Sequence, residues 1–240
     1  MSNIKQDIGI IIFSRMDSNR LPGKALIDIF GRELLGRVID RAKHINVAGR
    51  IVVATSSRSV DDPIAYYAES EGVSVYRGDV DNVAGRALET CKFFGFVKFA
   101  RICGDRPFFD PELVSSLLEI HDELNIDIVT TMFPRTFPPG LTTEIISTDS
   151  LEFALSKTDD PVDREHITNY FYNNPQKFKI HNVDIPNNKN YDNVHLVVDN
   201  ENDLLRARWI GSKIQTTHND VNTIISLAKE WENTSNIGRD

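Results

Sequence analysis

Residues 8–24, IGIIIFSRMDSNRLPGK, join an apolar run to a short cationic loop. The run Ile8–Phe13 is typical of a parallel strand that is buried on both faces. The loop that follows carries three cations: Arg15, Arg20 and Lys24. Guanidinium and backbone N–H groups at a strand end can surround the oxygens of a polyphosphate, whereas the alternative is a basic loop that only faces solvent. Residues farther along the chain decide between these readings.

The composition narrows the class of protein. The 240 residues include 40% hydrophobic and 26% charged residues, as in ordinary globular proteins. A net charge of −8 argues against a nucleic-acid-binding surface, so the local excess of cations calls for a specific reason. Two cysteines without CxxC spacing, Cys91 and Cys103, predict reduced thiols and a cytoplasmic protein. We expect no membrane segment and no signal peptide, because the apolar runs are short.

Apolar runs and helical patterns alternate through the first half of the chain, which predicts a mostly parallel α/β sheet with helices on both faces. Ligands bind such sheets outside the carboxyl ends of the strands, where the cationic loop lies. The expected strands cover residues 8–13, 51–55, 73–76, 96–102 and 126–132, and the expected helices cover residues 33–44, 61–71, 82–94 and 111–124.

The second half is less regular. The proline-rich segment at residues 133–140, FPRTFPPG, predicts an extended loop. We expect one domain over residues 1–240 with an excursion at about 133–185 that serves as a dimer arm or a lid. Further strands are expected at 141–147, 178–183 and 194–198, and further helices at 148–157, 163–172, 201–211 and 219–231.

Two aspartates stand directly after apolar runs. Asp105 follows residues 96–102 closely, and Asp199 follows the run Leu196-Val197-Val198. Carboxylates at strand ends can hold Mg²⁺, which often takes one or two carboxylates together with substrate phosphates. A lone aspartate ahead of a helix is more often a helix cap, but a second one at another strand end favours a metal site. The cations and carboxylates together suit a nucleoside triphosphate.

Six segments in order resemble the cytidylyltransferases that make CMP-activated acidic sugars, namely the acylneuraminate and ketodeoxyoctonate enzymes, and most of all their spore-coat polysaccharide branch. The resemblance spans nearly the whole chain. The matching segments are residues 15–24 (RMDSNRLPGK), 51–55 with 61–63, 77–86 (RGDVDNVAGR), 104–111 (GDRPFFDP), 161–168 (PVDREHIT) and 197–204 (VVDNENDL).

The resemblance implies a Rossmann-like nucleotidyltransferase fold, a homodimer, and roles for individual residues. Asp105 and Asp199 would hold Mg²⁺, and Arg15, Lys24 and these two carboxylates would be the catalytic set. CTP would contact Arg15, Ser18, Arg20 and Lys24 through its phosphates, and Arg77, Gly78 and Arg86 near its base. The sugar acceptor would be bound in the region of Glu144, Arg164, Glu165 and His166, although His166 could equally be a buried structural histidine.

The chain departs from the family pattern at four positions. Asp17 replaces a glycine of the first loop, Cys103 replaces a threonine, and Asn82 and Thr142 stand where the spore-coat branch has aspartates. Asp17 is the most notable, because its charge would oppose phosphates unless it points away from them or touches the metal.

The predicted reaction is the Mg²⁺-dependent transfer of CMP from CTP to an acidic sugar, with release of pyrophosphate, for surface polysaccharide or glycan synthesis. Two alternatives stay open at this point. One is a glycosyltransferase that consumes a nucleotide-sugar, and the other is a catalytically degenerate paralogue that only binds nucleotide. The residues single out no general base and no particular acceptor sugar.

Overall fold

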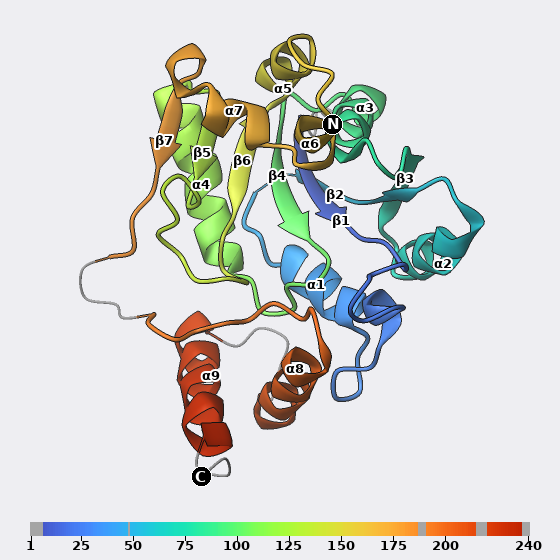
Figure 1. Cartoon of the computed structure of the whole chain (residues 1–240), viewed down its shortest axis with the longest axis vertical. Coiled ribbons are helices and arrows are strands. Elements are labelled where there is room, and N and C mark those ends of the chain that lie inside the picture. The colour runs from blue at the N-terminus through green and yellow to red at the C-terminus, as the bar shows by residue number, and fades with distance from the viewer. Residues whose placement is uncertain (1–6, 48, 187–190, 215–219, 237–240) are drawn as a thin grey trace, which may run out of the picture.

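A seven-stranded sheet with helices on both faces forms the body of the protein (Figure 1). The computed structural model describes residues 7–47, 49–186, 191–214 and 220–236. The strand order across the sheet is β3-β2-β1-β4-β6-β5-β7. The strands are β1 (Ile8–Phe13), β2 (Gly49–Ser56), β3 (Ser74–Gly78), β4 (Lys98–Cys103), β5 (Ile128–Thr130), β6 (Glu144–Ser147) and β7 (Ile180–Asn182).

The strand β1 lies between two parallel neighbours, β2 and β4. Its interior residues, Ile10, Ile11 and Ile12, are at most 2% exposed, as the unbroken apolar run predicted. Phe13 is the register partner of Ala54 in β2 and of Cys103 in β4. The loops that follow β1 and β4 therefore begin at the same level, at the edge of a parallel sheet where ligands bind.

Helices cover both faces of this sheet because successive residues of β1 point to opposite sides. Ile10 and Ile12 pack in a core with α1 and α4, whereas Ile11 packs in a second core with α3 and α5. The longer helices are α1 (Leu34–Ala42), α2 (Asp62–Ser70), α3 (Val83–Phe94), α4 (Pro111–Leu124), α5 (Thr148–Leu155), α8 (Glu201–Lys213) and α9 (Val221–Asn236). The short ones are α6 (Pro161–Glu165), α7 (Asn169–Asn173) and the 3₁₀ turns η1 (Lys24–Leu26), η2 (Ser59–Asp61) and η3 (Pro175–Lys177).

The mostly parallel α/β fold expected from the sequence is confirmed. The segment 133–185, expected to be an excursion, contributes β6 and β7 to the sheet, and β6 lies between β4 and β5. β6 runs antiparallel to both neighbours, which the sequence did not indicate. Outside the sheet, α8 and α9 lie side by side over a third core that also takes in Leu21 and Phe108 (Figure 1).

Two expectations about single elements were wrong. Residues 194–198 form no strand, because the N–H groups of Leu196 and Val198 donate to Pro139 and Asp105 in loops, not to a neighbouring strand. The helix expected at 163–172 is divided into α6 and α7, since the chain becomes extended at His166 (φ −107°, ψ 95°). The helix expected from Asn219 is described from Val221 as α9, and Asn219 itself lies outside the described residues.

Gly104 lets the ends of β1 and β4 approach closely. Its N–H donates to the Phe13 carbonyl oxygen at 2.8 Å. A Cβ at this position would lie 2.9 Å from the Cβ of Ser14 and 3.0 Å from the Phe13 oxygen. Any larger residue must therefore push the two loops apart.

We expect Gly104→Ala to lower the free energy of unfolding by about 1–3 kcal/mol, the usual cost of overpacking a close contact. Chemical denaturation measures this change. Ser116→Ala on the exposed side of α4 is the control and should change stability by less than about 0.5 kcal/mol. An unchanged unfolding midpoint for the glycine variant would show that the strand ends are not closely packed.

Candidate active site

The cationic loop after β1 is held in a compact turn by backbone contacts. The N–H of Gly23 donates to the Met16 carbonyl oxygen at 2.7 Å, and Gly23 has a φ of 74°. Glycine adopts this left-handed conformation without the strain that a Cβ would cause. The turn brings Lys24, the first residue of η1, back toward the end of the sheet.

A buried carboxylate fixes the same loop from the side of β2. Asp61 is fully buried, and its Oδ1 accepts a hydrogen bond from the N–H of Met16 at 2.7 Å. Its Oδ2 accepts from the hydroxyl of Ser56 and pairs with Arg58 at 3.4 Å. The Asp61-Asp62-Pro63 segment thus orients the loop as well as beginning α2.

Lys24 joins the carboxylate of Asp105, which follows β4, to that of Asp199, which does not stand at a strand end because residues 194–198 form no strand. Its ammonium nitrogen lies 2.9 Å from Oδ2 of Asp105 and 2.7 Å from Oδ1 of Asp199. Arg20 also pairs with Asp199, at 2.8 Å between Nη2 and Oδ2. Burial alone raises the pKa of Asp199, but Lys24 and Arg20 more than offset it, so that pKa lies below its usual value. The carboxylate of Asp199 therefore stays ionised at neutral pH.

A cavity of about 600 Å³ contains this cluster. One half is formed by the cationic loop and the carboxylates of Asp105 and Asp199. The other half lies on the α3 side of the sheet, which also carries Phe13 of β1 and Phe99 of β4. The residues lining the first half include Ser14, Arg15, Ser18, Asn19, Arg20, Lys24, Gly104, Asp105 and Asp199, and those lining the second are Val83, Arg86, Arg101, Cys103, Glu165 and His166.

The two carboxylates fit a divalent cation that is also bound by substrate phosphates. Oxygens of Asp105 and Asp199 lie within 3 Å of one nitrogen, so they are less than about 6 Å apart. Mg²⁺ holds oxygens at about 2.0–2.1 Å and commonly takes one or two carboxylates together with phosphates and water. No cluster of three or more acidic, histidine or cysteine side chains suited to a metal occurs among the described residues.

A sequence profile of cytidylyltransferases matches residues 9–232. The chain belongs to the cytidylyltransferase family. An uncharacterized protein of Methanocaldococcus jannaschii is 29% identical over 227 residues, which cover 95% of this chain and 92% of that protein. The spore coat polysaccharide biosynthesis protein SpsF of Bacillus subtilis is 26% identical over 202 residues, 82% of this chain and 83% of that protein.

Solved structures agree with this membership. A cytidylyltransferase from Leptospira borgpetersenii has a TM-score of 0.88 and 29% identity to this chain, and the match covers 98% of both chains. A CMP:2-keto-3-deoxy-manno-octonic acid synthetase solved with CTP shares the fold, with a TM-score of 0.65 and 18% identity over 86% of this chain and 98% of that one. The resemblance inferred from the sequence is therefore confirmed.

Nine of the expected site residues line the cavity of this cytidylyltransferase, and four do not. Arg77 lies outside it, because its guanidinium binds the carbonyl oxygens of Ser56 and Arg58 and pairs with Asp62 at 2.6 Å. Those in the cavity are Arg15, Ser18, Arg20, Lys24, Arg86, Asp105, Glu165, His166 and Asp199, and those outside it are Arg77, Gly78, Glu144 and Arg164.

Gly78 and Arg164 have structural contacts. A Cβ on Gly78 would lie 3.0 Å from Cγ of Arg86, so the glycine leaves room for that buried side chain. Arg164 donates to the carbonyl oxygens of Leu155 and Thr158 and pairs with Asp159 at 3.0 Å, which fastens the connection between α5 and α6. Both residues shape the cavity only through their neighbours.

Arg101 is a cavity residue that sequence reasoning missed, and Glu144 holds it in place. The antiparallel register pairs Arg101 of β4 with Glu144 of β6, and Nη1 lies 2.5 Å from Oε2. Oε1 of Glu144 accepts hydrogen bonds from Thr168 at 2.8 Å and from the Tyr172 hydroxyl. The signal in the sequence is a single arginine inside the apolar strand KFARIC. A charge at such a position requires a partner.

Contacts in the structure account for two of the four departures from the family pattern, Asp17 and Asn82. Asp17 points to Arg58, with Oδ2 2.8 Å from Nη1, and this hydrogen bond keeps the pKa of Asp17 below its usual value, while Oδ1 lies 3.7 Å from Nε of Arg15. Asn82 caps α3 by accepting from the N–H of Gly85 at 2.8 Å, which an aspartate would also do. Thr142 is buried, and its carbonyl oxygen accepts from Arg106. Cys103 lines the cavity without a role that the structure identifies.

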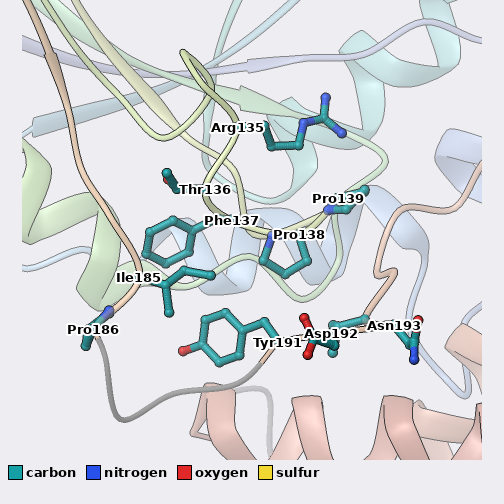
Figure 2. A pocket seen from close by; sticks show the side chains of 11 residues that line it. Arg135, Thr136, Phe137, Pro138, Pro139, Ile185, Pro186, Tyr191, Asp192 and Asn193 are labelled. Carbon is teal, nitrogen blue, oxygen red and sulfur yellow. The ribbon is translucent and has the colours of Figure 1, made fainter.

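A second cavity of about 690 Å³ lies beside the proline-rich loop and shares no lining residue with the first. The side chains of Phe137, Ile185 and Tyr191 lie around it (Figure 2). The rings of Phe137 and Tyr191 are 6.1 Å apart between centroids. Neither Asp105 nor Asp199 lines this second cavity.

None of the described helices is long and apolar enough to cross a bilayer.

Replacing Glu144 by Gln should lower the free energy of unfolding by about 2–3 kcal/mol at pH 7, because it leaves the partly buried Arg101 without its counter-charge. Burial raises the pKa of Glu144, but Arg101, Tyr172 and Thr168 together bring it below its usual value. The stabilisation is therefore complete above the usual carboxyl pKa and is lost as the pH falls through the lowered one.

Denaturation at several pH values measures this dependence, and the difference between wild type and Glu144→Gln should vanish in acid. Tyr172→Phe is the matched control. It removes one hydrogen bond to the same carboxylate but no charge, so we expect a loss of about 1 kcal/mol. Equal losses for the two variants would contradict the proposed importance of the ion pair.

Proposed function

We propose that this cytidylyltransferase transfers CMP from CTP to an acidic sugar and releases pyrophosphate, with Mg²⁺ as its cofactor. The observation that carries the proposal is that one cavity joins a cationic loop, the carboxylates of Asp105 and Asp199, and a second half that contains Arg101, held by Glu144. A hydroxyl oxygen of the sugar attacks the α-phosphorus, and the bond from that phosphorus to the bridging oxygen of the leaving pyrophosphate breaks. The hydroxyl proton is released.

The triphosphate is placed against the cationic loop. Arg15, Arg20 and Lys24 supply charge there, and Ser18 supplies a hydroxyl donor. Charge-assisted hydrogen bonds of this kind are the strong ones in proteins, so the loop both holds the nucleotide and neutralises the leaving pyrophosphate.

Arg86 extends the nucleotide site toward α3. It is 4% exposed, burial lowers its pKa, and its Nε has no hydrogen-bond partner among the described residues. A buried donor without a partner is costly, so a ligand that accepts a hydrogen bond there gains affinity. This supports the place of Arg86 in the part of the site that faces the nucleoside.

Asp105 and Asp199 are the residues that would hold Mg²⁺. When bound, the ion would neutralise charge that develops on the reacting phosphate and on the leaving group. The protein contributes by holding the two carboxylates close to the cationic loop. A backbone hydrogen bond joins the two segments that carry these carboxylates, because the N–H of Val198 donates to the Asp105 carbonyl oxygen at 2.9 Å.

The acceptor is placed in the second half of the cavity. Arg101 lies there with one N–H donated to Glu144, and the guanidinium carries five donors in all. Its other N–H groups suit the carboxylate of an acidic sugar, while Glu165 and His166 stand at the same wall. Glu144 thus acts as a positioning residue, not as a direct acceptor contact.

Family membership favours making an activated sugar over consuming one. Of the features that suggested a degenerate paralogue, Asn82 caps α3, and Asp17 pairs more closely with Arg58, at 2.8 Å, than with the site residue Arg15, at 3.7 Å. A homodimer, a cytoplasmic location and a part in polysaccharide synthesis stay predictions.

A pyrophosphate-release screen tests the function. Each nucleoside triphosphate is incubated with Mg²⁺ and a panel of acidic sugars, and we expect release with CTP and at least one of them. Asp105→Asn should lose more than about 100-fold in turnover, because one metal-binding carboxylate is gone, with the melting temperature showing that the fold survives. Asp192→Asn, beside the second cavity, is the control and should turn over normally. No release with any combination would contradict the proposal.

Arg101→Gln tests the acceptor half. With the sugar that the screen finds, we expect KM for that sugar to rise at least tenfold, because a charge-assisted contact contributes about 1.5–3 kcal/mol. CTP affinity in calorimetry should stay within twofold. Wild type should also use the acceptor sugar with a free carboxylate better than the same sugar with a carboxamide, and the variant should not. A variant that keeps this preference would show that Arg101 does not bind the carboxylate of the sugar.

A further inference from the structure

Every N–H donor of the Lys24 ammonium group has a partner within the protein. Besides the carboxylates of Asp105 and Asp199, at 2.9 and 2.7 Å, it donates to the Val198 carbonyl oxygen at 2.9 Å. A lysine ammonium has three donors, so none is left for a phosphate. The side chain is 12% exposed, so water does not compete strongly for it.

The same contacts occupy the carboxylates. A metal ion held by Asp105 and Asp199 would bind the same carboxylate oxygens that now accept hydrogen bonds from Lys24. A metal ion and the lysine ammonium group on the same oxygens would repel each other strongly, because the site is partly buried. Arg20 pairs with the second oxygen of Asp199, at 2.8 Å between Nη2 and Oδ2. Lysine and metal are therefore alternative counter-ions for one pair of carboxylates.

We propose that Lys24 is a placeholder cation that keeps the metal site closed until a triphosphate arrives. This inference rests on the proposed function, since CTP is the ligand that draws Lys24 away. The phosphates offer the ammonium group stronger acceptors, Lys24 turns to them, and the vacated carboxylates take the metal that the phosphates also bind. The metal then binds with the nucleotide or after it, and by linkage each favours the other.

The backbone can accommodate this exchange without rearrangement. Lys24 is anchored by its N–H, which donates to Leu21 at 3.2 Å, so only its side-chain torsions need to change. The N–H of Asp199 donates to Asp203 Oδ2 at 3.0 Å, and Val198 is bonded to Asp105. The backbone that carries the two carboxylates is therefore held by contacts that do not involve the lysine side chain.

The test measures Mn²⁺ binding to the full chain without nucleotide, by the electron paramagnetic resonance signal of free Mn²⁺. We expect Lys24→Met to bind Mn²⁺ at least tenfold more tightly than wild type, because methionine keeps the length of the side chain but removes the charge. Lys24→Gln, which is shorter and neutral, should behave alike and serves if the methionine variant does not fold.

Two controls identify the site. Lys43→Met removes a lysine that lies 3.7 Å from Glu71, outside the cavity, and should leave Mn²⁺ affinity as in wild type. Adding Asp105→Asn to Lys24→Met should abolish the gain. If Lys24→Met and Lys24→Gln bind Mn²⁺ no more tightly than wild type, or if the gain survives loss of Asp105, the proposal is wrong.

The Mn²⁺-binding test and the pyrophosphate-release screen can fail independently of each other. A gain in Mn²⁺ affinity together with no pyrophosphate release from any triphosphate would keep the placeholder role and reject the reaction. Release of pyrophosphate without the gain would keep the reaction and reject the placeholder role.

Discussion

The parallel pairing of β1 with both neighbours is the constraint on which the site depends. It sets Phe13 level with Cys103, so the loops after β1 and β4 leave the sheet side by side. Lys24 can then reach Asp105, which lies 81 positions away in the chain. The hydrogen bond from Gly104 to Phe13 holds the two strand ends at this spacing, and a fully buried aspartate, Asp61, fixes the loop from the other side. Opposite charges meet because the backbone has already placed them.

The second half of the cavity depends on a different contact. β6 enters the sheet antiparallel, and its first residue, Glu144, faces Arg101 across the ladder. A buried ion pair is expensive to form unless further hydrogen bonds complete it, and here Thr168 and Tyr172 do so. Thr168, which stands between α6 and α7, donates one of these hydrogen bonds at 2.8 Å. Sheet and helices are thus joined at a polar centre.

Much of the fold and part of the site could be predicted from the sequence. The apolar run of β1 could belong only to a buried strand, and Asp105 and Asp199 could be recognised by what precedes them. The direction and place of β6 could not be predicted, because four residues carry no signal of either. Residues 194–198 include three valines, which favour a strand, but their partners are loops, which no local pattern reveals. Arg77 was expected to touch a ligand because a matching segment contains it, and Glu144 because it lies in the acceptor region that the resemblance implies, whereas the contacts of both are internal.

The segment that carries Asp199 lies outside the sheet, although it supplies one of the two carboxylates that Lys24 joins. It is fastened through Val198 to the loop after β4, and Asp203 and Arg206 at the start of α8 pair at 2.6 Å just beyond it. All seven strands are complete by Asn182. A chain cut after that residue would retain every strand of the sheet and lack half of the carboxylate pair. A complete sheet therefore does not complete the site, because Asp199 comes from the stretch of chain that follows the last strand.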